Sequence, residues 1–417
     1  MSLQFITGGS GAGKSEYLSR LVCEESVRRP HDNFIVVVPE QYTMETQKKL
    51  VHMHSRKGIL NIDVVSFERL AYKVFEELGG GNRPVLDDTG KNLIVRRVLE
   101  KEKKKLDYFG SSIEKTGFVS ELKSVISELL QYGITPQQLG EIGENVKEKQ
   151  QLSAKLKDIR LVYKEFMAFL STNYITSEEI LDVLCGLVEK SKLIAGSEII
   201  FDGFTGFTPI QYKLMRLLLV YSKGIKISVT IDKKERPTGH EGWNNLFFMS
   251  KEMMNRLIAI CEEEGINVDD TVCVDRDINY RYEGAKDLAY LERNLFRYKG
   301  GVYTGTPENI RIYEGSNPKE ELQYIVSEIL QLTRKEGFRY RDIAVVTADL
   351  ETYGKVAANM MKQNDIPAFL DYKRSVASNP YVEMLCSALE IVEKGYPYDT
   401  MFRYLRTGLT GIKRHDI

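Results

Sequence analysis

The chain has 417 residues, of which 42% are hydrophobic and 28% are charged, a composition typical of a globular protein with roughly two or three domains. Its 58 basic and 59 acidic side chains give a formal net charge of −1, which excludes a uniformly basic nucleic-acid-binding surface but not a local patch. The N-terminus lacks the basic and apolar regions of a signal peptide, and no apolar run reaches the length of a membrane span. We therefore expect a cytoplasmic protein with no membrane segment.

The cysteines and histidines do not predict a metal site or a disulfide framework. The five cysteines are scattered and never form a C-x-x-C pair. His52 and His54 lie close in sequence, but residues two apart on a helix point in different directions. We expect free thiols in a reducing compartment.

The first 78 residues alternate between apolar runs and helical periodicity. Strands that are apolar on both faces are predicted at Leu3–Thr7, Phe34–Val38 and Ile62–Val65. Helices are predicted at Lys14–Glu24, Met44–His52 and Phe67–Leu78. This order is typical of a parallel sheet covered by helices.

The pattern becomes helical from Asp87 to about Lys190 and then returns to the alternating form. Strands are predicted again at Glu198–Phe201 and Ile225–Ile231, with a helix at Pro209–Tyr221 between them. We therefore assign residues 1–86 and 191–300 to one α/β domain and residues 87–190 to a helical insertion. The charged run Glu100–Lys105 is either a solvated helix face or a DNA-backbone contact.

Residues 301–417 predict a second α/β domain. Its expected strands are Ile310–Tyr313, Ile343–Thr347 and Ala368–Leu370. Its expected helices are Lys319–Glu336, Tyr353–Gln363, Pro380–Val392 and Asp399–Leu405. Because no polar segment closes this domain, we interpret it as incomplete and the chain as a fragment.

A glycine-rich segment directly after the first predicted strand fits the P-loop pattern G-x-x-x-x-G-K-[ST]. Its residues are Gly8, Gly9, Ser10, Gly11, Ala12, Gly13, Lys14 and Ser15. Glycines let successive backbone N–H groups converge on phosphate oxygens, and the following helix directs its positive end at the same anion. Lys14 is expected to be exposed and to contact the β- and γ-phosphates of ATP, and Ser15 to ligate Mg²⁺. The alternative is a flexible loop with a fortuitous Lys-Ser.

The residues needed for hydrolysis are incomplete. Asp202, which ends a predicted strand, is the expected second Mg²⁺ ligand and completes the nucleotide site. It is followed by Gly203 rather than by a glutamate that could activate water, and no glutamine follows Ile231. The sequence therefore predicts ATP binding without efficient turnover.

Five separated blocks resemble the AddB subunit, and the similar RexB proteins, of bacterial AddAB helicase–nucleases. Besides the P-loop, they are VPEQYT (Val38–Thr43), VVSFERLAYKV (Val64–Val74), IIFDGFTGFTPIQ (Ile199–Gln211) and RYRDIAVVTADLETY (Arg339–Tyr353) with IPAFLDYKRSVASNPYVE (Ile366–Glu383). The resemblance implies a superfamily 1 helicase type of fold, with one RecA-like domain that carries the insertion and the start of a second.

The same resemblance implies a role in resecting double-strand breaks for recombinational repair. It implies a heterodimer with AddA, which carries the active helicase, and the reading of the Chi sequence in single-stranded DNA. A nuclease domain and an iron–sulfur cluster are expected only in a C-terminal part beyond these residues.

The residues expected to bind DNA follow predicted strands, where open α/β sheets bind ligands. They are Gln41, Thr43, Phe67, Arg69, Tyr72, Phe204 and Phe207. Gln and Arg can contact base edges, and Phe and Tyr can stack on unpaired bases. For Phe67 and Tyr72 the alternative is a place in the core of their helix. Two other functions stay open, a working ATP-driven translocase and a small-molecule kinase.

Overall fold

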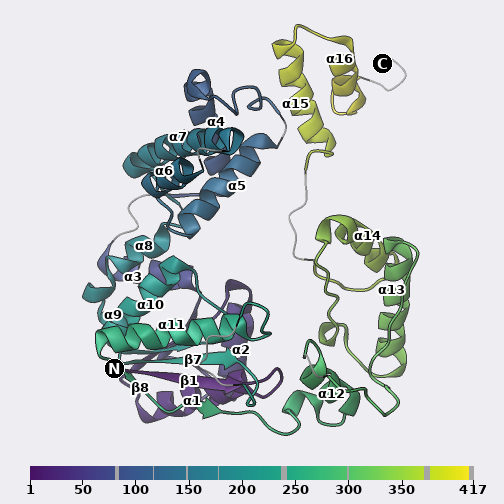
Figure 1. Ribbon diagram of the computed structural model, residues 1–417. Coiled ribbons are helices and arrows are strands. Elements are labelled where there is room, and N and C mark those ends of the chain that lie inside the picture. The colour runs from purple at the N-terminus through teal and green to yellow at the C-terminus, as the bar shows by residue number, and fades with distance from the viewer. Residues whose placement is uncertain are drawn as a thin grey trace. The chain divides into compact units, whose positions relative to one another are not determined.

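The computed structural model describes residues 1–79, 84–115, 117–146, 149–176, 178–235, 242–297, 300–370 and 376–412. These residues form two compact units, Met1–Ile310 and Arg311–Ile417. Figure 1 shows a sheet with helices on both faces and a group of helices, α4 to α7, in the first unit. No helix within the described ranges is long and apolar enough to cross a membrane.

The centre of unit 1 is a parallel sheet. Its described strands are β1 (Ser2–Gly8), β2 (Asn33–Val37), β3 (Ile62–Val65), β6 (Ser197–Phe201), β7 (Gly224–Thr230), β8 (Asn267–Val268) and β9 (Val272–Cys273). The order is β3-β2-β6-β7-β1-β8, with β9 also paired to β1, and the pairs between these described strands are all parallel. The predicted strands on either side of the helical insertion therefore share one sheet, as expected.

Helices cover both faces because successive strand residues point in opposite directions. Phe34 and Val36 of β2 pack in the cluster that contains α1 (Lys14–Arg28) and α2 (Thr43–Met53). Ile35 and Val37 pack in the cluster on the other face. The helices of that face are α3 (Phe67–Leu78), α8 (Ile180–Cys185), α10 (Pro209–Tyr221) and α11 (Phe248–Glu264). Strands that are buried on both faces explain why they read as uninterrupted apolar runs.

The insertion has a hydrophobic core of its own. Its helices are α4 (Asp88–Glu102), α5 (Phe118–Gln131), α6 (Pro136–Asn145) and α7 (Gln150–Asn173). Helical periodicity did not predict the short parallel pair β4 (Val85–Leu86) and β5 (Ile175–Thr176), which joins the entry and exit of the insertion. Residues 180–195 add α8, a 3₁₀ turn at Val188–Lys190 and α9 (Lys192–Ala195). In Glu100–Lys105, Lys101, Lys103 and Lys105 form ion pairs with Glu165, Glu114 and Glu102, as on a solvated face.

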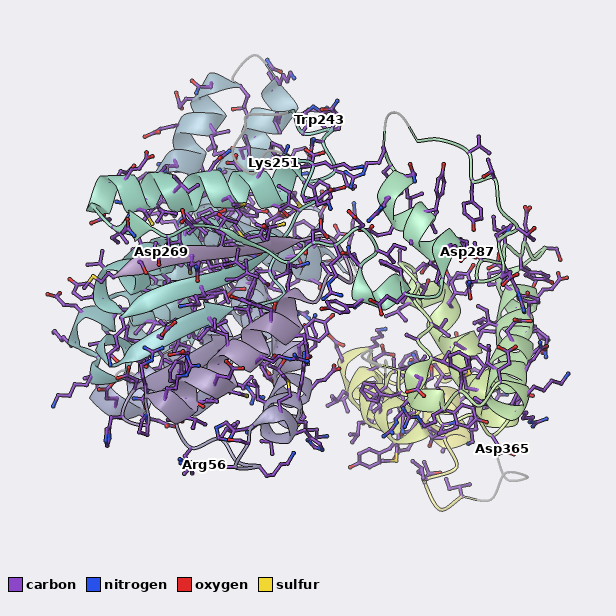
Figure 2. All side chains as sticks on the ribbon, turned by 90° about the horizontal axis from the view of Figure 1, so that it is seen from below. Arg56, Trp243, Lys251, Asp269, Asp287 and Asp365 are labelled. Carbon is purple, nitrogen blue, oxygen red and sulfur yellow. The ribbon has the colours of Figure 1, made fainter. Side chains whose placement is uncertain are left out.

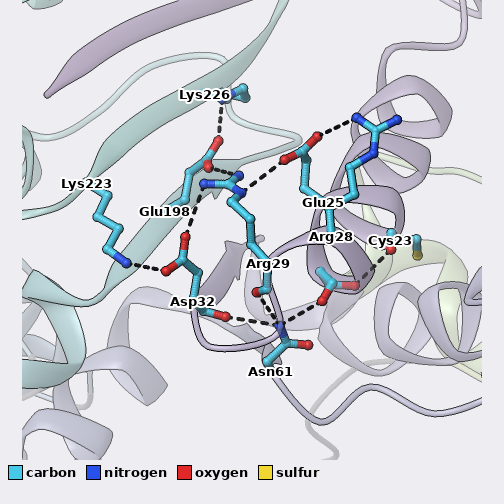
Figure 3. A network of polar contacts seen from close by, with 10 residues as sticks. Cys23, Glu25, Arg28, Arg29, Asp32, Asn61, Glu198, Lys223 and Lys226 are labelled. Atoms are coloured by element: carbon cyan, nitrogen blue, oxygen red, sulfur yellow. Dashed lines mark hydrogen bonds and ion pairs between the residues drawn. The ribbon is translucent and has the colours of Figure 1, made fainter.

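A polar network ties together segments on both sides of the insertion (Figure 3). Glu198, at the start of β6, accepts hydrogen bonds from Arg29 at 2.5 Å and from Lys226 of β7. Arg29 and Lys223 also pair with Asp32, which precedes β2. Burial raises the pKa of Glu198, but hydrogen bonds from Lys226 and Arg29 outweigh burial and hold this pKa below its usual range. The network therefore favours a charged Glu198 at the amino end of the strands.

Unit 2 corrects the prediction of a second α/β domain. Its described elements are α13 (Pro318–Lys335), α14 (Leu350–Gln363), α15 (Pro380–Glu393), α16 (Tyr398–Arg406) and a 3₁₀ turn at Tyr340–Asp342. The strands predicted at 310–313, 343–347 and 368–370 are not formed, because a strand needs a partner for its backbone groups and none of the three segments pairs. Ile312, Val346 and Phe369 are about nine-tenths exposed. Several residues of these segments line an apolar pocket of about 1020 Å³ beside α13 and α14.

Candidate nucleotide site and carboxyl edge of the sheet

The glycine-rich turn joins β1 to α1, as the P-loop motif predicts. Gly11 and Gly13 adopt φ values of 72° and 96°, which side chains with a Cβ atom rarely tolerate. The Lys14 Nζ atom donates hydrogen bonds to the carbonyl oxygens of Gly8 and Gly9, both at 2.9 Å. Lys14 is half-buried rather than exposed, which differs from the sequence-based expectation.

Lys14 lies in an acidic surrounding. Burial lowers the pKa of its ammonium group, while the carboxylates of Asp202 and Asp275 act in the opposite direction, and the net shift is downward. Arg281 adds a repulsive charge that also lowers this pKa. A phosphate group beside Lys14 would supply the negative charge that favours the ammonium form.

A pocket of about 370 Å³ gathers the predicted phosphate and metal ligands. It is lined by Ser10, Gly11, Gly13, Lys14, Ser15, Glu16, Lys49, Asp202, Gly203, Phe204, Thr205, Ser228, Thr230 and Arg281. Gly8, Gly9 and Ala12 complete the turn without lining this pocket. Ser15 and Asp202, which lie far apart in the sequence of unit 1, therefore share one cavity.

Asp202 is oriented by its neighbours. It follows β6, and its backbone N–H donates to the carbonyl oxygen of Val37 at 3.0 Å. The Ser228 hydroxyl donates to Asp202 Oδ1 at 2.5 Å and accepts from the Gly203 N–H at 3.3 Å. One strand, β7, separates the strand of Asp202 from that of the glycine-rich turn. Hard oxygen donors such as Ser15 and Asp202 fit Mg²⁺.

Several residues that contact the turn were not predicted from the sequence. They lie between β9 and the end of α12 (Lys286–Asn294), around the 3₁₀ turn η4 (Tyr280–Tyr282). The Arg281 N–H donates to the Gly11 carbonyl oxygen at 3.3 Å, and the Gly9 N–H donates to Asp275 Oδ1 at 3.1 Å. Periodicity could not reveal these contacts, because Gly9 and Asp275 are 266 positions apart.

The loops after β2, β3 and β6 meet at the same carboxyl edge. Arg69 is exposed, and its guanidinium forms a 2.9 Å ion pair with Glu40 next to the exposed Gln41. Tyr72, one turn further along α3, is 38% exposed. Phe204 and Phe207 are half-buried and lie 5.5 Å apart between ring centroids. Gln41, Arg69 and Tyr72 thus present polar and aromatic groups to solvent.

Phe67 and Thr43 require a correction as DNA-binding residues. The Phe67 ring is only 8% exposed and lies 5.6, 5.4 and 6.0 Å from the rings of Phe201, Phe204 and Phe207. It therefore belongs to the core, as the alternative interpretation holds, and offers no free face to a base. Thr43 is 6% exposed, and its hydroxyl donates to the Glu40 carbonyl oxygen at 2.9 Å, which starts α2.

A parallel sheet covered by helices, with a glycine-rich turn at the carboxyl end of its first strand, defines an α/β protein with a ligand pocket at that edge. The chain belongs to the AddB family, because the model of the AddB N-terminal region matches residues 5–292.

Curated relatives are named as one of the subunits of an ATP-dependent helicase/deoxyribonuclease. The protein from Lachnoclostridium phytofermentans is 42% identical over the whole of this chain. Those from Caldanaerobacter subterraneus and Clostridioides difficile are each 36% identical over the whole chain. The chain spans about 36% of the length of each of these relatives.

Proposed function

We propose that this chain is the helicase-like part of a helicase–exonuclease subunit and that its P-loop binds ATP with Mg²⁺. The observation that carries the proposal is the meeting of Lys14, Ser15, Asp202 and Arg281 in one pocket. Lys14 and Arg281 would neutralise the phosphates, while Ser15 and Asp202 would hold Mg²⁺. Bound Mg²⁺ would offset further negative charge on the phosphates. A RecA-like domain of superfamily 1 helicase type accommodates these roles.

We infer that the site binds ATP without acting as a motor. Gly203 occupies the position after Asp202, and its φ of 84° is unfavourable for a side chain such as glutamate. The pocket lining also contains no glutamine that could sense the γ-phosphate, while its one glutamate, Glu16, is paired with Lys49 and Arg20. The alternative is an active translocase, which would need a water-activating group from elsewhere.

The carboxyl edge is the proposed binding surface for single-stranded DNA. Arg69 and Gln41 can form hydrogen bonds with base edges, and Tyr72 and Phe204 can stack on bases. Phe207, which contacts Phe204, would support this surface. We propose that these residues read the short Chi sequence while AddA, as partner, drives translocation during the resection of duplex ends. Such division of labour is consistent with the near-zero formal charge of −1.

The test combines calorimetry with an ATPase assay. We expect wild-type protein to bind ATP–Mg²⁺, Lys14→Ala to lose binding, and the control Lys48→Ala, at an exposed position of α2, to behave as wild type. Equal affinity of wild type and Lys14→Ala would refute the nucleotide site. A robust ATPase rate stimulated by single-stranded DNA would instead support the translocase alternative.

A further inference from the structure

The segment Asp275–Glu292, which we call the strap, holds the glycine-rich turn from outside. Its first contact is the hydrogen bond from the Gly9 N–H to Asp275. Its Asn279 Nδ2 donates to the Ser10 carbonyl oxygen at 3.3 Å, and the Arg281 N–H donates to that of Gly11. The strap therefore contacts three consecutive residues of the turn through both main-chain and side-chain groups.

The strap and the turn are also in close packing contact. A Cβ atom added at Gly11 would lie 2.6 Å from Arg281 Cβ, so only glycine fits there. Glu292, in α12, accepts a hydrogen bond from the Ser10 N–H. A displacement of Ser10 or Gly11 would therefore be felt by η4 and α12.

The other end of α12 holds the chain where unit 1 ends. Asp287, in the first turn of α12, is 4% exposed and accepts hydrogen bonds from the Glu308 N–H at 2.9 Å and the Asn309 N–H at 2.7 Å. The Asn309 side-chain amide donates to the same carboxylate at 2.9 Å. We call these contacts the Asp287 clasp. Hydrogen bonds from Asn309 lower the pKa of Asp287 to about 2.

A short helix connects the two sets of contacts. Glu292 and Asp287 both belong to α12 (Lys286–Asn294), so a shift at the turn moves the clasp as well. Figure 2 labels Asp287 on this helix and Asp269 beside the sheet. The clasped residues Glu308 and Asn309 lie just before Arg311, the first residue of unit 2.

We propose that nucleotide binding at the glycine-rich turn loosens the Asp287 clasp, so that the strap reports nucleotide occupancy to the chain that leads into unit 2. This inference rests on the proposed ATP site. The carboxylates of Asp202, Asp275 and Glu292 are the charges that favour the ammonium form of Lys14 in this structure. Phosphates take over Lys14 and place negative charge beside Asp275 and Glu292, which weakens the hold of the strap on Gly9 and Ser10.

The test is hydrogen–deuterium exchange at the Glu308 and Asn309 amides, with and without ATP–Mg²⁺ at concentrations that calorimetry shows to be saturating. In wild-type protein we expect ATP–Mg²⁺ to accelerate their exchange by about tenfold. Asp287→Asn should exchange fast in both conditions while retaining wild-type nucleotide affinity. Asn309→Ala, a milder change, should exchange at an intermediate rate without nucleotide.

Two controls separate the clasp from the nucleotide site. Asp269→Asn, a matched change outside the strap, should respond as wild type, and Lys14→Ala should show no response to ATP–Mg²⁺. If wild type binds ATP but the two amides exchange at an unchanged or slower rate, the clasp inference is wrong and the proposed function stands. If wild type does not bind ATP, the proposed function fails and the clasp inference fails with it.

Discussion

The guanidinium of Arg69 and the carboxylate of Glu40 form a 2.9 Å ion pair at the carboxyl edge of the sheet. Both side chains are more than half exposed, so the pair contributes little to stability. Arg69 can therefore exchange Glu40 for a base edge at small cost. The pair places a group that can read bases on the loop edge where β2 and β3 end.

Arg69→Ala and, separately, Gln41→Ala should impair binding to DNA with Chi but not to DNA without it. Loss of one good base contact costs about 1–3 kcal/mol for the preferred sequence only, whereas phosphate contacts affect all sequences. The measurement is the affinity of the heterodimer for both DNAs at one fixed salt concentration.

Arg28→Ala is the matched control, because Arg28 also forms an exposed ion pair, with Glu25, but at the amino end of the strands. It should leave both affinities unchanged. If Arg69→Ala weakens both DNAs equally, Arg69 contacts the backbone or supports the fold, and its assignment to Chi is wrong.

Phe67→Ala should destabilise unit 1 by about 3–5 kcal/mol, the usual cost of removing a buried phenylalanine ring. Phe67→Leu, which retains most of the volume, should cost less than about 1.5 kcal/mol and leave DNA binding intact. Chemical denaturation and DNA affinity are measured for both variants. A folded Phe67→Leu protein that has lost DNA binding would restore Phe67 as a stacking residue.

Glu198→Gln should make unfolding less sensitive to acid. Because the folded pKa of Glu198 lies below its ordinary value of 4.5, its charged form stabilises the fold above that pH, and this stabilisation is lost as the pH falls through the folded pKa. The variant should lose about 1–3 kcal/mol at neutral pH and show a shallower decline in stability below pH 4.5. The exposed Glu24→Gln serves as control. Parallel wild-type and Glu198→Gln curves would show that the network does not depend on this charge.

Local signals predicted the elements of unit 1 well, because each signal acts within a few residues. Thr208 and Gln211 share a capping box, and Pro209 occupies the first turn, so α10 begins where its sequence indicates. Ser66 caps α3 through the Arg69 N–H in the same way. These features need no knowledge of the rest of the chain.

Features that depend on distant partners could not be predicted in this way. Residues 343–347 have the composition of a strand, yet a strand forms only beside another strand. The contact of Asp275 with Gly9 joins opposite ends of unit 1, and no periodicity reveals it. Phe67 was ambiguous because an apolar residue at a helix start is equally compatible with a core and with a stacking surface, and only the rings of Phe201 and Phe204 decide.

Gly203→Glu tests why the site would bind ATP without acting as a motor. This substitution supplies the glutamate that a helicase of this type has after its metal-binding aspartate, so a site lacking only that group should gain DNA-stimulated ATPase activity. We expect no gain. Gly203 has a φ of 84°, and a side chain there costs about 1–2 kcal/mol in backbone strain. The Gly203 N–H also donates to Ser228, which orients Asp202, so a backbone that relaxes the strain displaces the metal ligand. Gly206→Glu, in the same loop but without a positive φ, is the matched control and should keep wild-type stability and nucleotide affinity. The measurements are thermal unfolding, ATP affinity and ATPase rate for the three proteins. A stable Gly203→Glu protein with strong DNA-stimulated ATPase activity would show that the backbone at Gly203 is no obstacle to hydrolysis, and that the site differs from a working motor by one side chain alone.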